Sequence, residues 1–228
     1  MTNGVRTDRG YEAELQALRS HLLLMVGRVE EMIAQSVRSL LEQDRELARR
    51  VVDADDRVNR DELEIDERCL RLLALRQPMA SDLRFITFAL KMVTDIERIG
   101  DHAAGIAERA CKIRDLTAEE ADAVQVLTGR VRANLALAIA AFRDRDVDKA
   151  RAVLDADDEI DELYHRLRRA EYARAEGGAY LKDRIRLQRV ARLLERIGDH
   201  TTNLAEQVIF MVRGKDLRHA GSVKPDGS

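Results

Sequence analysis

The sequence predicts an all-α protein built as two tandem three-helix bundles that are related by an internal repeat. Three observations carry this prediction. The 228 residues are 45% hydrophobic and 36% charged, with two prolines and no tryptophan, a composition typical of helical proteins. Apolar residues recur at three- and four-residue steps along most of the chain. Finally, a six-residue motif that begins at position 97 occurs again, unchanged, at position 195.

The first bundle is predicted over residues 11–114. Asp44 has the position and chemistry of an N-cap, and Pro78 is expected to end the second helix because the residue before a proline avoids the α region. Ser81 is predicted to cap the third helix. The three predicted helices cover residues 11–43, 45–76 and 81–113.

The second bundle is predicted over residues 115–214. Thr117 and Glu120 have the spacing of a capping box, and Asp146 is predicted to cap the next helix. The glycine pair at 177–178 separates that helix from the last one, and Gly214 is a predicted C-terminal cap. The three predicted helices cover residues 118–143, 147–175 and 180–213.

The repeat extends beyond the motif Glu-Arg-Ile-Gly-Asp-His. Residues 44–56 also match residues 146–158, including the run Asp-Ala-Asp-Asp in both copies. The chain therefore reads as two copies of one three-helix unit. The small, polar ends of the chain, residues 1–10 and 220–228, are predicted to be flexible tails.

Carboxylates spaced four residues apart recur in both copies. Residues with this spacing share one face of a helix, and clustered carboxylates repel one another unless a cation lies between them. Hard oxygen ligands suit Mg²⁺, Ca²⁺, Mn²⁺ or iron. The alternative is a solvated acidic surface with intrahelical ion pairs. The candidate residues are the pairs Asp55 and Asn59, Glu97 and Asp101, Asp157 and Asp161, and Glu195 and Asp199.

The residues around these carboxylates limit the kinds of metal site that they could form. Apolar stripes lie on other faces of the two motif helices, so the carboxylates are expected to point away from the bundle core. His102 and His200 follow the aspartates directly, about 100° around the helix, and are expected to pack or form hydrogen bonds rather than bind metal. Gly100 and Gly198 stand where ferritin-like oxidases carry histidine, which argues against such an oxidase. The glycines indicate either close helix approach or an open surface.

Charge and motifs exclude several classes of function. The net charge of −3 with interspersed signs argues against general nucleic-acid binding. No apolar run reaches the roughly 20 residues that span a bilayer, and the two cysteines form no CxxC pattern, so we expect a cytoplasmic protein without membrane insertion. No phosphate loop or nucleophile motif is present, and no enzymatic activity is expected. A basic stripe on the last helix could dock an acidic partner or remain solvated; it comprises Lys182, Arg186, Arg189 and Arg196.

Several segments, in one order, closely resemble the PhoU family of phosphate-transport accessory proteins. They are the two Glu-Arg-Ile-Gly-Asp motifs and residues 65–69, 76–84 and 214–219. The resemblance spans about residues 11 to 219. It implies two three-helix bundles related by pseudo-twofold symmetry, commonly assembled as a homodimer.

The resemblance also implies a function. Such a protein is expected to be a cytoplasmic negative regulator of the phosphate-starvation response, coupling the ATPase of the phosphate importer to a sensor histidine kinase. Some family members bind metal clusters through paired acidic motifs, and the eight candidate residues above occupy the matching positions. Asn59 departs from a full acidic pair, which makes the first site the weaker inference. The alternatives are a metal-storage bundle, with divalent metal or iron clusters, and a purely structural dimerisation module.

Overall fold

The computed structural model describes residues 3–114, 116–173 and 179–214, and these residues form seven α-helices. The helices are α1 (Asn3–Leu41), α2 (Arg45–Leu75), α3 (Ala80–Ala110), α4 (Ala118–Asp144), α5 (Val147–Asp155), α6 (Asp157–Ala173) and α7 (Ala179–Arg213).

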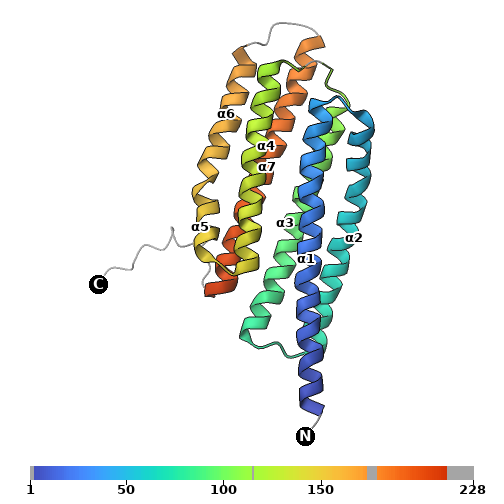
Figure 1. The fold of residues 1–228 in the computed structure, drawn as a ribbon, viewed down its shortest axis with the longest axis vertical. Coiled ribbons are helices and arrows are strands. Elements are labelled where there is room, and N and C mark those ends of the chain that lie inside the picture. Colours follow the sequence, from blue (N-terminus) through green and yellow to red (C-terminus); the bar gives the residue numbers. More distant parts are fainter. Residues whose placement is uncertain (1–2, 115, 174–178, 215–228) are drawn as a thin grey trace, which may run out of the picture.

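The helices form two groups that lie side by side along the long axis of the molecule (Figure 1). The first group packs α1, α2 and α3 against one another. The second packs α4 and α7 with α5 and α6, which together take the place of one long helix. This confirms the predicted fold of two tandem three-helix bundles.

Most predicted helix ends are confirmed. The Asp44 carboxylate accepts a hydrogen bond from the backbone N–H of Leu47 at 2.9 Å. Thr117 and Glu120 form both bonds of a capping box, and Asp146 caps α5. Gly214 has a positive φ of 68°, which L-residues rarely adopt, and it ends α7 as predicted.

Three predictions of helix bounds are wrong. First, α1 begins at Asn3, so the described part of the predicted tail over residues 1–10 is helical; no proline interrupts the segment, and extending an existing helix costs less than nucleating one. Second, Met79 rather than Ser81 precedes the first turn of α3, and its carbonyl accepts the N–H of Leu83. Met79 is extended, and the chain becomes helical at Ala80, before Ser81.

Third, the fifth predicted helix is divided at Ala156 into α5 and α6. Three acidic residues follow in the first turn of α6, where the positive end of the helix dipole stabilises them. Such a turn favours a new helix start at this point. The glycine pair at 177–178 and the predicted tail at 220–228 lie outside the described residues.

The two bundles share one hydrophobic core. A single cluster of buried side chains runs from Leu15 on α1 to Met211 on α7. At one part of the seam Phe85 and Phe88 of α3 stack on Phe142 of α4, with ring centroids 6.5 and 5.0 Å apart respectively. α3 and α7, the two helices that carry the repeated motif, also pack against each other. The seam therefore fixes the two motif helices relative to one another.

Candidate functional site: two acidic clusters

The first acidic cluster joins α2 to α3. It contains two of the predicted carboxylate positions on α3 and one on α2, and the structure adds two further carboxylates from α2. Its members, which we call the first acidic cluster, are Asp55, Glu62, Asp66, Glu97 and Asp101.

Mutual repulsion and burial alter the chemistry of these groups. Burial, followed by the negative charge of Asp101 and then of Glu62, raises the pKa of Glu97 to about 7. Burial and then Asp101 raise the pKa of Asp55 in the same direction, and burial followed by Asp66 and Asp101 raises the pKa of Glu62. The cluster therefore resists full ionisation, and a proton or a cation relieves that cost.

The second acidic cluster joins α6 to α7 and consists of Asp157, Asp161, Glu195 and Asp199. Burial and then Asp199 raise the pKa of Glu195 to about 6. The pKa of Asp157 is raised by burial and then by Asp161 and Asp199. All four predicted residues thus lie together, as the paired spacing on two packed helices predicts.

One expectation about these carboxylates is wrong. Glu195 does not point away from the core, since only 8% of it is exposed. It pairs with Arg192 on its own helix, which compensates part of its burial. The apolar stripes themselves lie where predicted: Ile99 and Ile197, two residues after Glu97 and Glu195, are fully buried.

Sequence reasoning missed Glu62 and Asp66, although a signal was available. Positions 55, 59, 62 and 66 follow the three- and four-residue steps that line one face of a helix. In the second copy the equivalent positions hold Tyr164 and Arg168, and the Arg168 guanidinium lies 5.9 Å from the centre of the Tyr164 ring. The repeat therefore keeps the fold but not the charge, and the first cluster is the more acidic of the two.

Glycines in the motif let the helices approach closely. A Cβ added at Gly100 would lie 3.1 Å from Cγ1 of Val58 on α2, and one added at Gly198 would lie 3.2 Å from Cγ2 of Ile160 on α6. Of the two explanations for these glycines, close helix approach is therefore the one that the packing supports. The approach also draws the acidic helices together, because Asp55 lies near Gly100 as well.

The motif histidines serve the seam between the bundles. His200 Nδ1 lies 2.9 Å from Oδ1 of Asp95 on α3, and the amide of Gln207 donates to the other oxygen at 2.7 Å. The rings of His102 and His200 lie 5.4 Å apart. Burial, followed by the charge of His200, lowers the pKa of His102 to about 4, so it is neutral at physiological pH. The predicted packing and hydrogen-bonding role is confirmed.

Three oxygen atoms in or beside the two clusters are of the type that a hard cation binds. Oδ1 of Asp55, Oδ1 of Asn59 and Oε2 of Glu195 are buried and have no hydrogen-bond partner in the structure. Unpaired buried carboxylate and amide oxygens are the donors that divalent cations prefer. Within the described ranges, no three His, Cys, Asp or Glu side chains stand close enough to hold one ion as they lie. Ligation would therefore need changes of side-chain rotamer.

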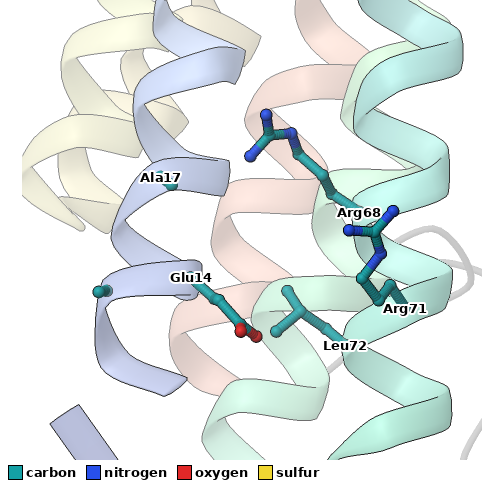
Figure 2. A pocket seen from close by; sticks show the side chains of 6 residues that line it. Glu14, Ala17, Arg68, Arg71 and Leu72 are labelled. Carbon is teal, nitrogen blue, oxygen red and sulfur yellow. The ribbon is translucent and has the colours of Figure 1, made fainter. Parts of the chain in front are cut away.

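A hollow of about 270 Å³ lies between α1 and α2, away from both clusters (Figure 2). Glu14 and Ala17 border it from α1, and Arg68, Arg71 and Leu72 from α2. Glu14 accepts a hydrogen bond from Arg76 at 3.3 Å, and Arg71 pairs with Glu67 at 2.9 Å. Glu14 and Arg71 therefore have partners within the chain. None of the predicted site residues borders the hollow, so it is not a candidate site.

Comparison with known proteins identifies the family that this chain resembles. The family model for the PhoU domain matches twice, at residues 22–110 and 125–208. A PhoU homologue from Pseudomonas aeruginosa, named a phosphate-specific transport system accessory protein, is 40% identical over 92% of this chain and 88% of its own length. PhoU of Escherichia coli, with the same description, is 31% identical over 95% of this chain and 90% of its own.

A solved structure agrees with the fold. The crystal structure of PhoU from Pseudomonas aeruginosa superposes with a TM-score of 0.86 at 38% identity, covering 90% of this chain and 100% of that one. Among the described residues, no helix combines the length and apolar character needed to cross a membrane.

Proposed function

Because the chain belongs to the PhoU family, we propose that it is an accessory protein of a phosphate-specific transport system. The observation that carries this proposal is the identity of 31–40% to accessory proteins of that description over more than nine-tenths of the chain. The acidic surfaces support it, because they offer charged docking faces on a rigid helical frame.

The finer proposal is a cytoplasmic negative regulator without catalytic activity. It binds the ATPase subunit of the phosphate importer and a sensor histidine kinase, and it holds the kinase inactive when phosphate is plentiful. Its mechanism is state-dependent contact: a partner that binds one conformation better shifts the kinase toward that conformation. The exposed Leu63 and Leu70, seven residues apart on α2, supply apolar contacts for a partner or for a second copy in a homodimer.

Deletion of the gene tests the regulatory role. A reporter of the phosphate-starvation response is expected to stay on in high phosphate, and a plasmid copy restores repression. Reporter output that ignores the deletion would count against the proposal. A pull-down from cells in high and low phosphate then identifies whether the importer ATPase and the kinase are captured, and whether capture depends on phosphate.

The second candidate function is a metal-binding or metal-storage bundle. The unpaired oxygens of Asp55, Asn59 and Glu195 favour it. Residues of the first and second acidic clusters would hold the ions, which would supply positive charge to neutralise the carboxylates. Elemental analysis of anaerobically purified protein is expected to find metal that is lost in the Glu97→Ala plus Glu195→Ala variant.

A matched control is Glu12→Ala plus Glu31→Ala, which removes two exposed carboxylates of α1. The control is expected to retain the metal. Protein that contains no metal, or that keeps its thermal stability when divalent cations are added and removed, would dismiss this candidate.

A further inference from the structure

A cavity of about 490 Å³ opens where the two bundles meet at one end of the molecule. This is the end at which α2 begins, α3 finishes and α7 begins, the upper end in Figure 1. Five cationic side chains and one carboxylate line it: Arg45, Lys112, Arg114, Lys182, Arg186 and Asp183.

The charge of this cavity differs from that of the chain as a whole, whose net charge is −3. Elsewhere many arginines pair with carboxylates on their own helix, as Arg57 does with Asp61 at 3.0 Å. No carboxylate of the described residues pairs with Arg45, Lys112 or Lys182 across the cavity. Cations gathered in a concave surface reinforce one another's field, which attracts anions from solution.

Buried contacts hold the cavity in shape. Asp183, which is 9% exposed, accepts the backbone N–H of Arg114 at 3.0 Å and a guanidinium N–H of Arg186 at 2.7 Å. The same guanidinium donates to the carbonyl of Lys112 at 2.7 Å. Hydrogen bonds of Asp183 and Arg186, in one turn of α7, thus hold the segment that follows α3 in place. Asp183, the one carboxylate among the described lining residues, therefore neutralises one of the five cations and holds Arg114 and Arg186 in place.

The hollow between α1 and α2 shows the contrast (Figure 2). It is smaller, about 270 Å³, and both Glu14 and Arg71 have partners there. Its lining has two arginines and one carboxylate, so it carries less net positive charge than the lining of the larger cavity.

The size and lining of the basic cavity define its ligand. Orthophosphate displaces the volume of a few water molecules, roughly 100 Å³, and would fill only a fraction of the space. The described side chains that line the cavity include no aromatic ring on which a base could stack. Several separated cations match several phosphoryl groups, because each phosphate oxygen accepts charge-assisted hydrogen bonds from arginine and lysine.

We propose that this cavity binds the phosphate chain of a small polyphosphate, either free inorganic polyphosphate or the triphosphate of a nucleotide. The proposal does not depend on a role in phosphate transport, and its test is a binding measurement on the isolated full chain. A negative result in the gene-deletion test would not count against binding at this cavity. A negative result in the binding measurement would not count against the regulatory role.

Isothermal titration calorimetry in about 0.1 M salt tests the proposal with four probes: tripolyphosphate, ATP, orthophosphate and citrate. Tripolyphosphate is expected to bind more tightly than orthophosphate or citrate. Equal affinity for tripolyphosphate and ATP shows that the phosphate chain alone is read, whereas tighter ATP binding assigns the site to a nucleotide.

The variant Lys112→Ala plus Lys182→Ala removes two exposed cations and keeps the hydrogen bonds that Asp183 accepts. It is expected to weaken tripolyphosphate binding about tenfold or more, since two charge-assisted contacts are lost. The matched control, Arg60→Ala plus Arg132→Ala, changes the net charge equally at exposed positions on α2 and α4 and is expected to leave the affinity unchanged.

Three results would overturn the proposal. The first is wild-type protein that shows no heat of binding with tripolyphosphate at about 1 mM. The second is citrate that binds as tightly as tripolyphosphate, which would remove the preference for phosphate. The third is an equal loss of affinity in both double variants, which would reduce the effect to overall charge.

Discussion

Glu97 is the residue at which burial and charge repulsion are combined most clearly. Its pKa is raised to about 7, first by burial and then by Asp101 and Glu62, while Arg98 opposes the shift. The folded protein therefore binds a proton at this position more tightly than the unfolded chain, for which the ordinary value is 4.5. Stability contributed by the protonated group is present below about pH 4.5 and is lost as the pH rises through 7.

Glu97→Gln is expected to remove this pH dependence, because the amide stays neutral. In the presence of a chelator it should raise the free energy of unfolding by about 1–2 kcal/mol at pH 8, a value reduced for solvent screening of a half-buried group. It should change stability little near pH 4.5. Urea unfolding at both pH values measures the difference.

Glu12→Gln on α1 supplies the control, since Glu12 is exposed and outside the acidic clusters. A Glu97→Gln effect that is the same at both pH values would show that the repulsion within the first acidic cluster does not destabilise the fold.

From the sequence, helical geometry predicts which residues share a face of a helix, but it does not predict how deeply each one is buried. The pairing of Asp55 with Asp101 followed from spacing and an antiparallel neighbour, and the structure places them together. The burial of Glu195 did not follow, because it depends on the distance between α6 and α7 and on the ion pair with Arg192. Periodicity shows which face a side chain occupies, but not how closely the next helix covers that face.

At the scale of elements, the repeated motif is first a packing device. Gly100 and Gly198 each face a β-branched side chain on the neighbouring helix, Val58 and Ile160 respectively. Both neighbours are buried and have little freedom to move. Gly129, in the middle of α4, has no atom within 4 Å of the position that a Cβ would take.

Alanine at these glycines should therefore have opposite effects. Gly129→Ala is expected to raise the free energy of unfolding by about 0.5–1 kcal/mol through helix propensity. Gly100→Ala gains the same propensity but overpacks against Val58 at a cost of about 1–3 kcal/mol, so we expect a net loss near 1 kcal/mol. Thermal and urea unfolding compare the two variants.

The double variant Gly100→Ala plus Val58→Ala separates overpacking from any other role of the glycine. The second change opens space for the new methyl group, so the two changes should be less costly together than the sum of the single losses. Simple additivity would mean that contact with Val58 is not the reason for glycine at position 100.

Some element ends follow from a local sequence pattern, whereas the break within the second helix of the second bundle was not predicted. The Asp44, Thr117 and Asp146 caps form hydrogen bonds within their own turn, so a local pattern suffices to find them. The break at Ala156 has the same local sequence as the first copy, Asp-Ala-Asp-Asp, which remains helical in α2. This four-residue run alone cannot distinguish the two copies. The residue that follows it does differ, Arg57 within α2 and Glu159 in the first turn of α6.

At the scale of the whole molecule, the sequence repeat suggests two units, whereas the core is one. Buried side chains of both bundles belong to a single cluster. Phe142 of α4 stacks on Phe85 and Phe88 of α3, and the Arg19 guanidinium of α1 lies 5.3 Å from the centre of its ring. Because the two bundles stabilise each other through this seam, the chain should unfold in one cooperative transition, with equal calorimetric and van't Hoff enthalpies.

Phe142→Ala tests this coupling across the seam. Loss of a fully buried ring is expected to lower the free energy of unfolding by about 3–5 kcal/mol. Within the described residues α2 packs only against α1 and α3 and does not contact α4. If the core is one unit, hydrogen exchange in the centre of α2 should accelerate as much as exchange in the centre of α4, because the slowest amides exchange through global unfolding.

Faster exchange confined to the second bundle would instead show two units that unfold independently. Leu127→Ala, at a buried position of α4, provides a comparison, because it too creates a cavity in the second bundle. If both variants accelerate exchange in α2 in proportion to their loss of stability, cooperativity belongs to the continuous core. If Phe142→Ala accelerates exchange in α4 but not in α2, while Leu127→Ala accelerates both, the aromatic stack itself couples the two bundles.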